Sequence, residues 1–234
     1  AEGGRSPRGE VAPGPGEGAR AVCPWVRVTA VSAVVGPAGR LPDSPAVVVG
    51  SMVIAPLIGP AMAASVGTVV DDPELALRGV KLQALGGVVA VGAAAAFALL
   101  IRTTNVVPLS AEEVFAIGEV RERLAPGVLS LVIALGAGGA GGVSLASGVS
   151  SALVGVMIAA ALVPPTAVVG IGIAWGEPAT VLGSGVLVLV NILAINLVAL
   201  VVLWRYGYRP RLWFREDEAR ATTLKRISVL AVVL

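Results

Sequence analysis

The sequence contains no histidine and only one cysteine, Cys23, among its 234 residues. The chain therefore lacks the side chain most often used as a general base near neutral pH, and a zinc site built on histidine or cysteine is excluded. One cysteine cannot form a disulfide within the chain. The apolar segments also carry no paired acids, so we expect the protein not to be an enzyme, with no catalytic residue, metal ion or cofactor.

Charged and aromatic residues are scarce as well, at 14% and 4%, whereas 56% of the residues are hydrophobic and the mean hydropathy is +0.90. A soluble domain carries about a quarter charged residues. Several apolar runs here reach the roughly 18–20 residues that cross ~30 Å of hydrocarbon. The predicted fold class is an all-α, polytopic integral membrane protein whose main partner is the lipid bilayer. The net charge of +2 is too small to indicate a nucleic-acid partner.

Six segments are expected to span the membrane, and they cover residues 24–36, 44–70, 76–101, 127–145, 150–174 and 179–204. The first is short for a full span and is followed by a turn rich in glycine and proline. It either reaches full length by including part of that turn or is an imperfect span. Residues 1–23 are rich in Gly, Pro and charge, which predicts a disordered tail. Residues 205–234 should form a basic cytoplasmic C-terminal segment, whose last run, ISVLAVVL, could begin a further span.

Two of these segments carry prolines in mid-span, in the runs GSMVIAPLIGP and GVMIAAALVPP. A proline inside a helix removes an amide donor and costs ~3 kcal/mol or more. Lipid supplies no replacement partner, so broken backbone at membrane depth is tolerated only inside protein or beside a water-filled cavity. We therefore predict that Pro56 and Pro60 break the second helix, that Pro164 and Pro165 break the fifth, and that the two breaks face each other.

Sliding the chain against itself by 105 residues superposes these two runs. The most informative coincidences are Gly50 with Gly155, Met52 with Met157, Pro60 with Pro165 and Pro73 with Pro178. If each half has three spans, residues 24–102 and 127–204 form an inverted repeat, an arrangement common in secondary transporters. If each broken segment re-enters instead, each half has two spans and the halves run parallel.

The distribution of basic residues favours the six-span version in the cell membrane with both termini cytoplasmic. Of the 17 lysines and arginines, only Arg40, Arg102, Arg121 and Arg123 then lie on the outer side. The other thirteen lie on the inner side or in the termini. This asymmetry follows the positive-inside rule.

The run GSMVIAPLIGPAMAASVG followed by GVMIAAALVPPTAVVGIGIAWG resembles the signature of a prokaryotic family of hydrophobic membrane proteins, domain of unknown function 389. The approach LPDSPAVVVGSM and the late helix NILAINLVAL are also similar to that family. The resemblance covers residues 28–204 and departs at PAGRLPDSP, where such proteins usually show a smoother first hairpin. It implies a multispanning membrane domain and assigns no substrate or reaction.

The candidate site lies at the two proline positions. Freed carbonyls at residues 51–55 and 156–160 could coordinate a cation, and freed amides after Pro60 or Pro165 could hold an anion. The structural alternative is that the prolines only shape packed kinks. The residues predicted to bind a solute are Ser51, Ala55, Pro56, Gly59, Pro60, Ala160, Pro164, Pro165, Thr166 and Asn191.

The function expected from this pattern is membrane transport, as a carrier or channel for an unidentified small solute or ion. The alternative is a membrane scaffold or sensor module that transports nothing and acts through its basic C-terminal segment. The sequence leaves a homo-oligomer open and identifies neither the solute nor a coupling ion.

Overall fold

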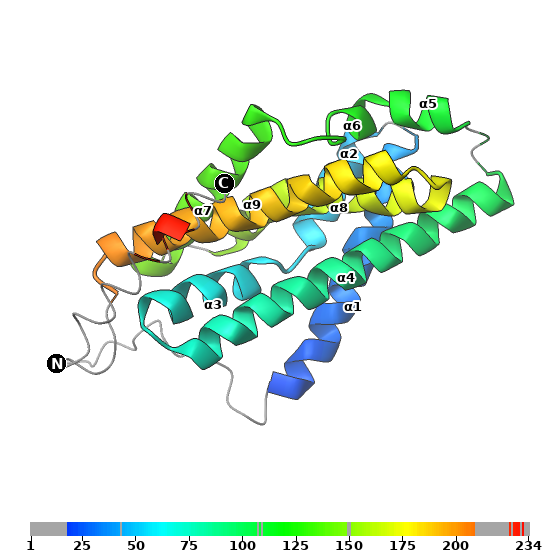
Figure 1. Cartoon of the computed structure of the whole chain (residues 1–234). Helices are drawn as coiled ribbons and strands as arrows, with labels where there is room; N and C mark the ends of the chain where they lie inside the picture. The colour runs from blue at the N-terminus through cyan, green and yellow to red at the C-terminus, as the bar shows by residue number, and fades with distance from the viewer. Residues whose placement is uncertain are drawn as a thin grey trace.

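The structure is a computed structural model that describes residues 18–42, 44–106, 108, 110–148, 151–208, 225, 227–229 and 231. Within these residues the chain is all-helical and contains no strand. The helices are α1 (Gly18–Arg40), α2 (Pro45–Ile54), α3 (Ile58–Val69), α4 (Pro73–Thr104), α5 (Ala111–Ala116), α6 (Gly118–Arg121), α7 (Val128–Ser147), α8 (Ser151–Trp175) and α9 (Pro178–Arg205). Figure 1 shows the long helices gathered into one bundle, with α5 and α6 at one end.

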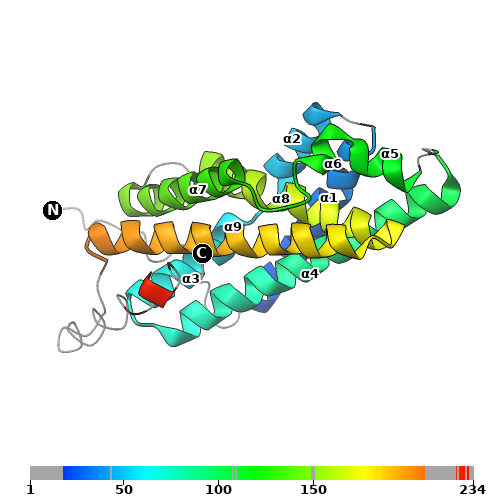
Figure 2. The same ribbon diagram turned by 45° about the horizontal axis from the view of Figure 1, so that its top comes forward.

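Five of these helices, α1, α4, α7, α8 and α9, are long and apolar enough to cross a membrane, and α2 with α3 makes a sixth span if the pair is counted as one. The protein is therefore built as a multispanning membrane protein. Helix α8 is the central element, because 78% of its most apolar stretch is buried, against 17% for α4. Figure 2 shows α7 and α9 running side by side over α8, with α4 beyond α9.

Helix α1 is longer at both ends than the sequence predicts. It begins at Gly18, inside the segment expected to be a disordered tail, and it continues through Gly36 and Pro37 to Arg40. Of the two alternatives for this segment, the structure has the full-length one, in which the residues of the expected turn continue the helix. The buried side chain of Arg40 donates from Nη1 to the carbonyl oxygen of Gly36 at 2.9 Å. This bond satisfies a carbonyl in the last turn of the helix, where arginine is favoured. Residues 1–17 of the predicted tail lie outside the described residues.

Helices α2 and α3 are separated by three non-helical residues, Ala55, Pro56 and Leu57, and their axes differ by 51°. Pro56 has no N–H to continue the ladder of α2, so a change of direction here follows from its chemistry. Pro60 lies in the first turn of α3, where helix amides have no partner in the helix and a missing N–H costs little. The interruption lies near the middle of the length of the bundle (Figure 1).

Helix α8 corrects the prediction of a broken fifth helix, because it is continuous from Ser151 to Trp175 with Pro164 and Pro165 inside it. Proline at position 165 deprives the carbonyl of Ala161 of its helical donor. The side-chain amide of Asn191 on α9 replaces that donor, at 2.8 Å from Nδ2 to the carbonyl oxygen. A helix tolerates an internal proline in a membrane when a neighbouring helix satisfies the freed group in this way.

Helices α4 and α9 start by the same device, a carboxylic residue followed by proline. Asp72 precedes Pro73 and accepts a hydrogen bond from the amide of Leu75 at 3.0 Å, while Glu177 precedes Pro178 with similar extended backbone angles. Proline in the first turn favours initiation of both helices, and the side chain of Asp72 adds a cap that Glu177 does not make. Of the predicted C-terminal segment 205–234, most lies outside the described residues.

Small residues let the helices approach closely. A Cβ atom added at Gly79 of α4 would lie 2.3 Å from the amide nitrogen of Ala64 on α3. One added at Gly138 of α7 would lie 2.4 Å from the carbonyl oxygen of Ile195 on α9. Backbone therefore packs against backbone at both contacts, which is how membrane helices gain van der Waals contact.

Candidate functional site

The candidate site is built around backbone carbonyls at the two proline segments that accept hydrogen bonds from side chains of other helices. The carbonyls of Pro56 and Ala161 stand four residues before Pro60 and Pro165, and the 105-residue shift superposes them. The indole Nε1 of Trp25 donates to the carbonyl oxygen of Pro56 at 2.7 Å, and Nδ2 of Asn191 donates to that of Ala161 at 2.8 Å. Matched carbonyls in the two halves are thus satisfied by side chains from different helices.

Two further carbonyls on the first proline segment also accept side-chain donors. The hydroxyl of Ser32 on α1 donates to the carbonyl oxygen of Ser51 in the last turn of α2, at 2.7 Å. The side-chain amide of Gln83 on α4 donates to the carbonyl oxygen of Pro60 at 3.2 Å. These bonds tie α1 and α4 to the two helix ends that flank the interruption.

Gln83 also links the two halves of the chain. Its Nε2 donates to Oδ1 of Asn196 on α9 at 3.3 Å, and Nδ2 of Asn196 returns a bond to Oε1 of Gln83 at 3.0 Å. The hydroxyl of Ser65 on α3 approaches Oδ1 of Asn196 at 3.3 Å. Three helices are therefore joined by an uncharged polar network beside the α2–α3 interruption.

A cavity of about 50 Å³ lies between the two proline segments. This volume has room for a few water molecules, since one needs roughly 10–15 Å³. Its walls come from α1, the α2–α3 linker, α3, α4, α8 and α9, and most of the lining is apolar. The polar side chains that line it are those of Trp25, Thr29, Ser32, Gln83 and Thr166.

Three of the ten predicted site residues line this cavity, namely Ala55, Pro60 and Thr166. Three others support it through hydrogen bonds, because the carbonyls of Ser51 and Pro56 accept side-chain donors and Asn191 donates to the carbonyl of Ala161. The remaining four are Gly59, Ala160, Pro164 and Pro165, and none of them lines the cavity.

Gly59 does not fit its predicted role in solute binding, because it is exposed and has open space where a Cβ atom would stand. As the second residue of α3 it faces away from the packed interior, and sequence position alone does not reveal that orientation. Ala160 is half-buried and packs against the cluster formed by Val48, Met52, Ala55, Ala159 and Val163. Pro164 and Pro165 are buried within α8.

Sequence reasoning missed the contribution of α1. Trp25, Thr29 and Ser32 line the cavity, and their spacing of four and then three residues places them on one helix face. The same face continues to Gly36 and to the buried Arg40. A polar stripe at helical spacing in an otherwise apolar segment is a signal that could have identified this wall.

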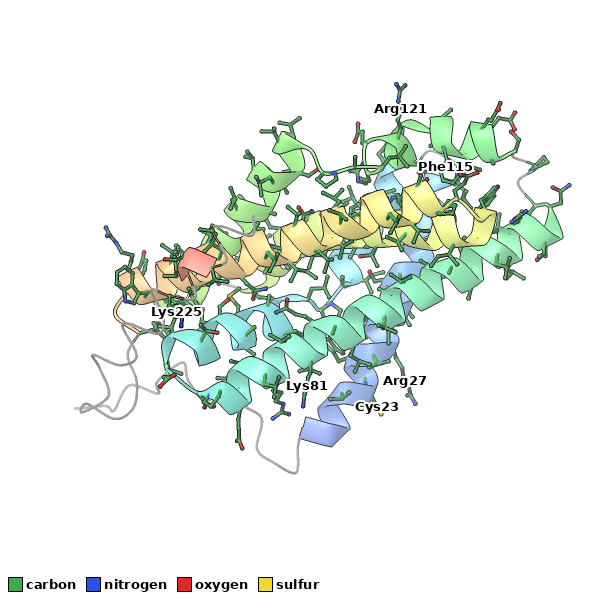
Figure 3. All side chains as sticks on the ribbon, in the orientation of Figure 1. Cys23, Arg27, Lys81, Phe115, Arg121 and Lys225 are labelled. Atoms are coloured by element: carbon green, nitrogen blue, oxygen red, sulfur yellow. The ribbon has the colours of Figure 1, made fainter. Side chains whose placement is uncertain are left out.

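The lining carries no formal charge, as every described residue around the cavity is uncharged. In Figure 3 the side chains of Arg27 and Lys81 point away from the bundle, and Arg121 extends outward from α6. Within the described part of the chain no group of three or more histidine, cysteine or acidic residues could hold a metal ion. A ligand of this cavity would therefore be recognised by hydrogen bonds and shape.

One titratable group outside the spans has a clear pKa shift. Hydrogen bonds from the backbone amide and the hydroxyl of Ser110 hold the pKa of Glu113 below its ordinary value. Both distances are 2.8 Å, and the amide of Glu113 in turn donates to the hydroxyl of Ser110. This reciprocal capping box starts α5, well away from the cavity.

Comparison with known proteins covers most of the membrane bundle. Residues 52–197 match the family described as domain of unknown function, DUF389. An uncharacterized protein of the archaeon Methanocaldococcus jannaschii is 37% identical over 199 residues, which is 84% of this chain. The chain spans 58% of the length of that relative. No solved structure matches the chain.

Proposed function

The chain belongs to the DUF389 family of prokaryotic membrane proteins, and from that premise we propose that it is a transport protein, a carrier or channel for a small solute. The observation that carries this proposal is the cavity that lies between the two proline segments. Both segments contribute to its wall, with Ala55 and Pro60 from one side and Thr166 from the other. Transporters commonly bind their solutes where interrupted helices of two repeats meet near the midplane.

The second element of the proposal is an inverted repeat that relates α1–α4 to α7–α9. Two features support it besides the 105-residue shift. Helices α4 and α9 occupy matched positions in the halves and run in opposite directions along the bundle (Figure 1). The central segment of each half also packs on the last helix of the other, α8 on α4 and α3 on α9.

The third element is the orientation, with both termini on the cytoplasmic side of the cell membrane. The turn at residues 71–72 and the end of α9 then face the cytoplasm, while α5 and α6 lie outside. The excess of basic residues near the termini, the turn at residues 71–72 and the end of α9 supports this orientation.

Accessibility of single cysteines tests the proposed cavity. Cys23 is exposed, so it is first replaced by serine to give a background without thiols. In the reconstituted protein we expect Ala55→Cys and Thr166→Cys to react with a small, membrane-impermeant thiol reagent. Ala194→Cys is the matched control, because Ala194 is fully buried in a packed cluster and does not line the cavity.

Equal protection of all three cysteines would contradict a solute pathway through this site. That outcome would favour the other function suggested by the sequence, a scaffold or sensor module without transport. The satisfied carbonyls at Ser51, Pro56, Pro60 and Ala161 are the observation in favour of that alternative, because each already has a donor within the protein.

A further inference from the structure

The hydroxyl groups that line the cavity have no proton to offer a ligand. Thr29 donates to the carbonyl oxygen of Trp25 at 2.9 Å, Ser32 to that of Ser51 at 2.7 Å and Thr166 to that of Leu162 at 2.6 Å. A backbone carbonyl can only accept, so each hydroxyl must be the donor in its bond. These three oxygens therefore present only lone pairs.

The nitrogen donors around the cavity are engaged too. The single N–H of the Trp25 indole is bound to the carbonyl of Pro56. The amide of Gln83 has two protons, and its two acceptors are the carbonyl oxygen of Pro60 and Oδ1 of Asn196. Every side-chain donor in the lining thus has an acceptor within the protein.

The backbone amides at the start of α3 are the remaining possible donors, because the amides at a helix start attract anions. Of the residues there, Leu57 and Pro60 line the cavity, whereas Ile58 and Gly59 do not. The amide of Leu57 donates to the carbonyl oxygen of Ala55 at 3.1 Å, and Pro60 has no N–H. The positive end of this helix therefore supplies no free donor to the cavity.

We propose that the cavity selects a small uncharged solute that carries hydrogen-bond donors, such as a hydroxyl or an amide N–H, and that it rejects anions. The lone pairs of Thr29, Ser32 and Thr166 accept from the solute, while Trp25, Leu57 and Leu162 contact its carbon skeleton. An anion would meet lone pairs, and the carbonyls of Ser51, Pro56 and Pro60 that could coordinate a cation already accept side-chain donors. No described lining residue carries a formal charge, and burial of an unpaired charge is strongly unfavourable. This inference rests on the transport function proposed above.

Flux measurements on liposomes that contain the purified full chain test the inference. Urea and glycerol serve as uncharged donors, nitrate as an anion and potassium as a cation. We expect urea or glycerol to cross faster than in protein-free liposomes, with nitrate and potassium at the protein-free rate. Thr29→Val and Thr166→Val should each slow the uncharged solute by about fivefold to tenfold, because each removes one hydrogen bond of roughly 1 kcal/mol.

Thr68→Val is the matched control for these variants. Thr68 makes the same type of bond, to the carbonyl oxygen of Ala64 at 2.8 Å, but it does not line the cavity. Its variant should transport at the unmodified rate, which separates the loss of a ligand contact from the loss of a local helix bond. A Thr29 or Thr166 variant that retained the full rate would overturn the proposal.

The ion measurements distinguish a wrong solute class from a wrong transport function. Protein-dependent flux of nitrate or potassium in excess of urea and glycerol would overturn the solute class and leave transport intact. If none of the four solutes crossed faster than in protein-free liposomes, the transport function itself would be refuted, and the selectivity inferred from it would fall as well.

Discussion

The two proline segments share a sequence pattern but differ in their backbone. Both carry a proline at the position that the 105-residue shift superposes, Pro60 in α3 and Pro165 in α8. The first segment is non-helical at Ala55–Leu57, whereas α8 continues through its prolines. The residue superposed on Pro56 is Ala161, whose N–H can join the helix ladder. The unmatched proline therefore decides where the backbone is interrupted, and the matched one does not.

The largest effect should come from giving α8 the proline that it lacks. Ala161→Pro removes the N–H of residue 161 in the middle of a buried helix, so we expect it to destabilise the fold by roughly 3 kcal/mol or more. The free energy of unfolding can be measured by titration of the purified chain in mixed micelles with sodium dodecyl sulfate. Ala161→Gly keeps the N–H and should cost only about 1 kcal/mol. Equal losses for the two variants would contradict this account of the interruption.

A smaller effect should follow from crowding the contact that holds α3. Since α3 is separated from α2, its position depends on packing, and Gly79 of α4 lies against the backbone of Ala64. Gly79→Ala should destabilise the chain by about 1–3 kcal/mol, because the added methyl group forces the helices apart. Gly92→Ala on the same helix has open space and should be neutral or stabilising by up to about 1 kcal/mol. The same detergent titration measures the free energy of unfolding of both variants. Equal changes in the two would contradict the role of the Gly79 contact in holding α3.

The donors that satisfy the matched carbonyls provide the third test. Asn191 is 2% exposed, so Asn191→Leu leaves the carbonyl of Ala161 without a donor at a dry position and should cost about 1–2 kcal/mol. The buried Oδ1 of Asn191 has no partner, and its removal offsets part of that loss. Loss of the indole hydrogen bond in Trp25→Phe should cost less free energy of unfolding, because the carbonyl of Pro56 lies beside a cavity that can hold water. A water molecule there can replace the lost donor. If loss of the indole hydrogen bond in Trp25→Phe cost more free energy of unfolding than Asn191→Leu, the assignment of these two donors would be refuted.

The smallest effect concerns α5, outside the spans. Because the pKa of Glu113 is lowered in the folded state, its bonds with Ser110 stabilise the start of α5 above the ordinary pKa of a glutamate. This contribution is lost as the pH falls through the lowered value. We therefore expect amide hydrogen exchange in α5, corrected for the intrinsic effect of pH, to accelerate on acidification. In Glu113→Gln the exchange rates, corrected for the intrinsic effect of pH, should stay constant, and a remaining transition there would assign the effect to another group.

Much of the bundle could be predicted because its signals are local. The pairs Asp72–Pro73 and Glu177–Pro178 mark the starts of α4 and α9, and hydropathy alone places every span except the first within a few residues. The family, too, follows from two short runs of sequence. Such features depend on residues close together in the chain.

The failures arise where a distant residue decides the outcome. The continuity of α8 depends on Asn191, which is thirty residues from the carbonyl it satisfies. The cavity depends on Trp25, Thr29 and Ser32, whose segment looked too short to span because Gly36 and Pro37 resemble a turn. The exposure of Gly59 depends on how α3 is oriented against its neighbours. Tertiary packing overrides local propensity at each of these positions.

The uncharged network of Gln83, Asn196 and Ser65 has a consequence for how the bundle responds to its surroundings. These amides and hydroxyls titrate nowhere in the physiological range and bear no net charge. A membrane potential acts on charge, at about 2.3 kcal/mol per elementary charge for each 100 mV. The join between the two halves is therefore indifferent to voltage and to proton gradients alike. A rearrangement of α3, α4 and α9 that responds to voltage would have to use charges outside this join, such as Arg78 and Lys81 on α4.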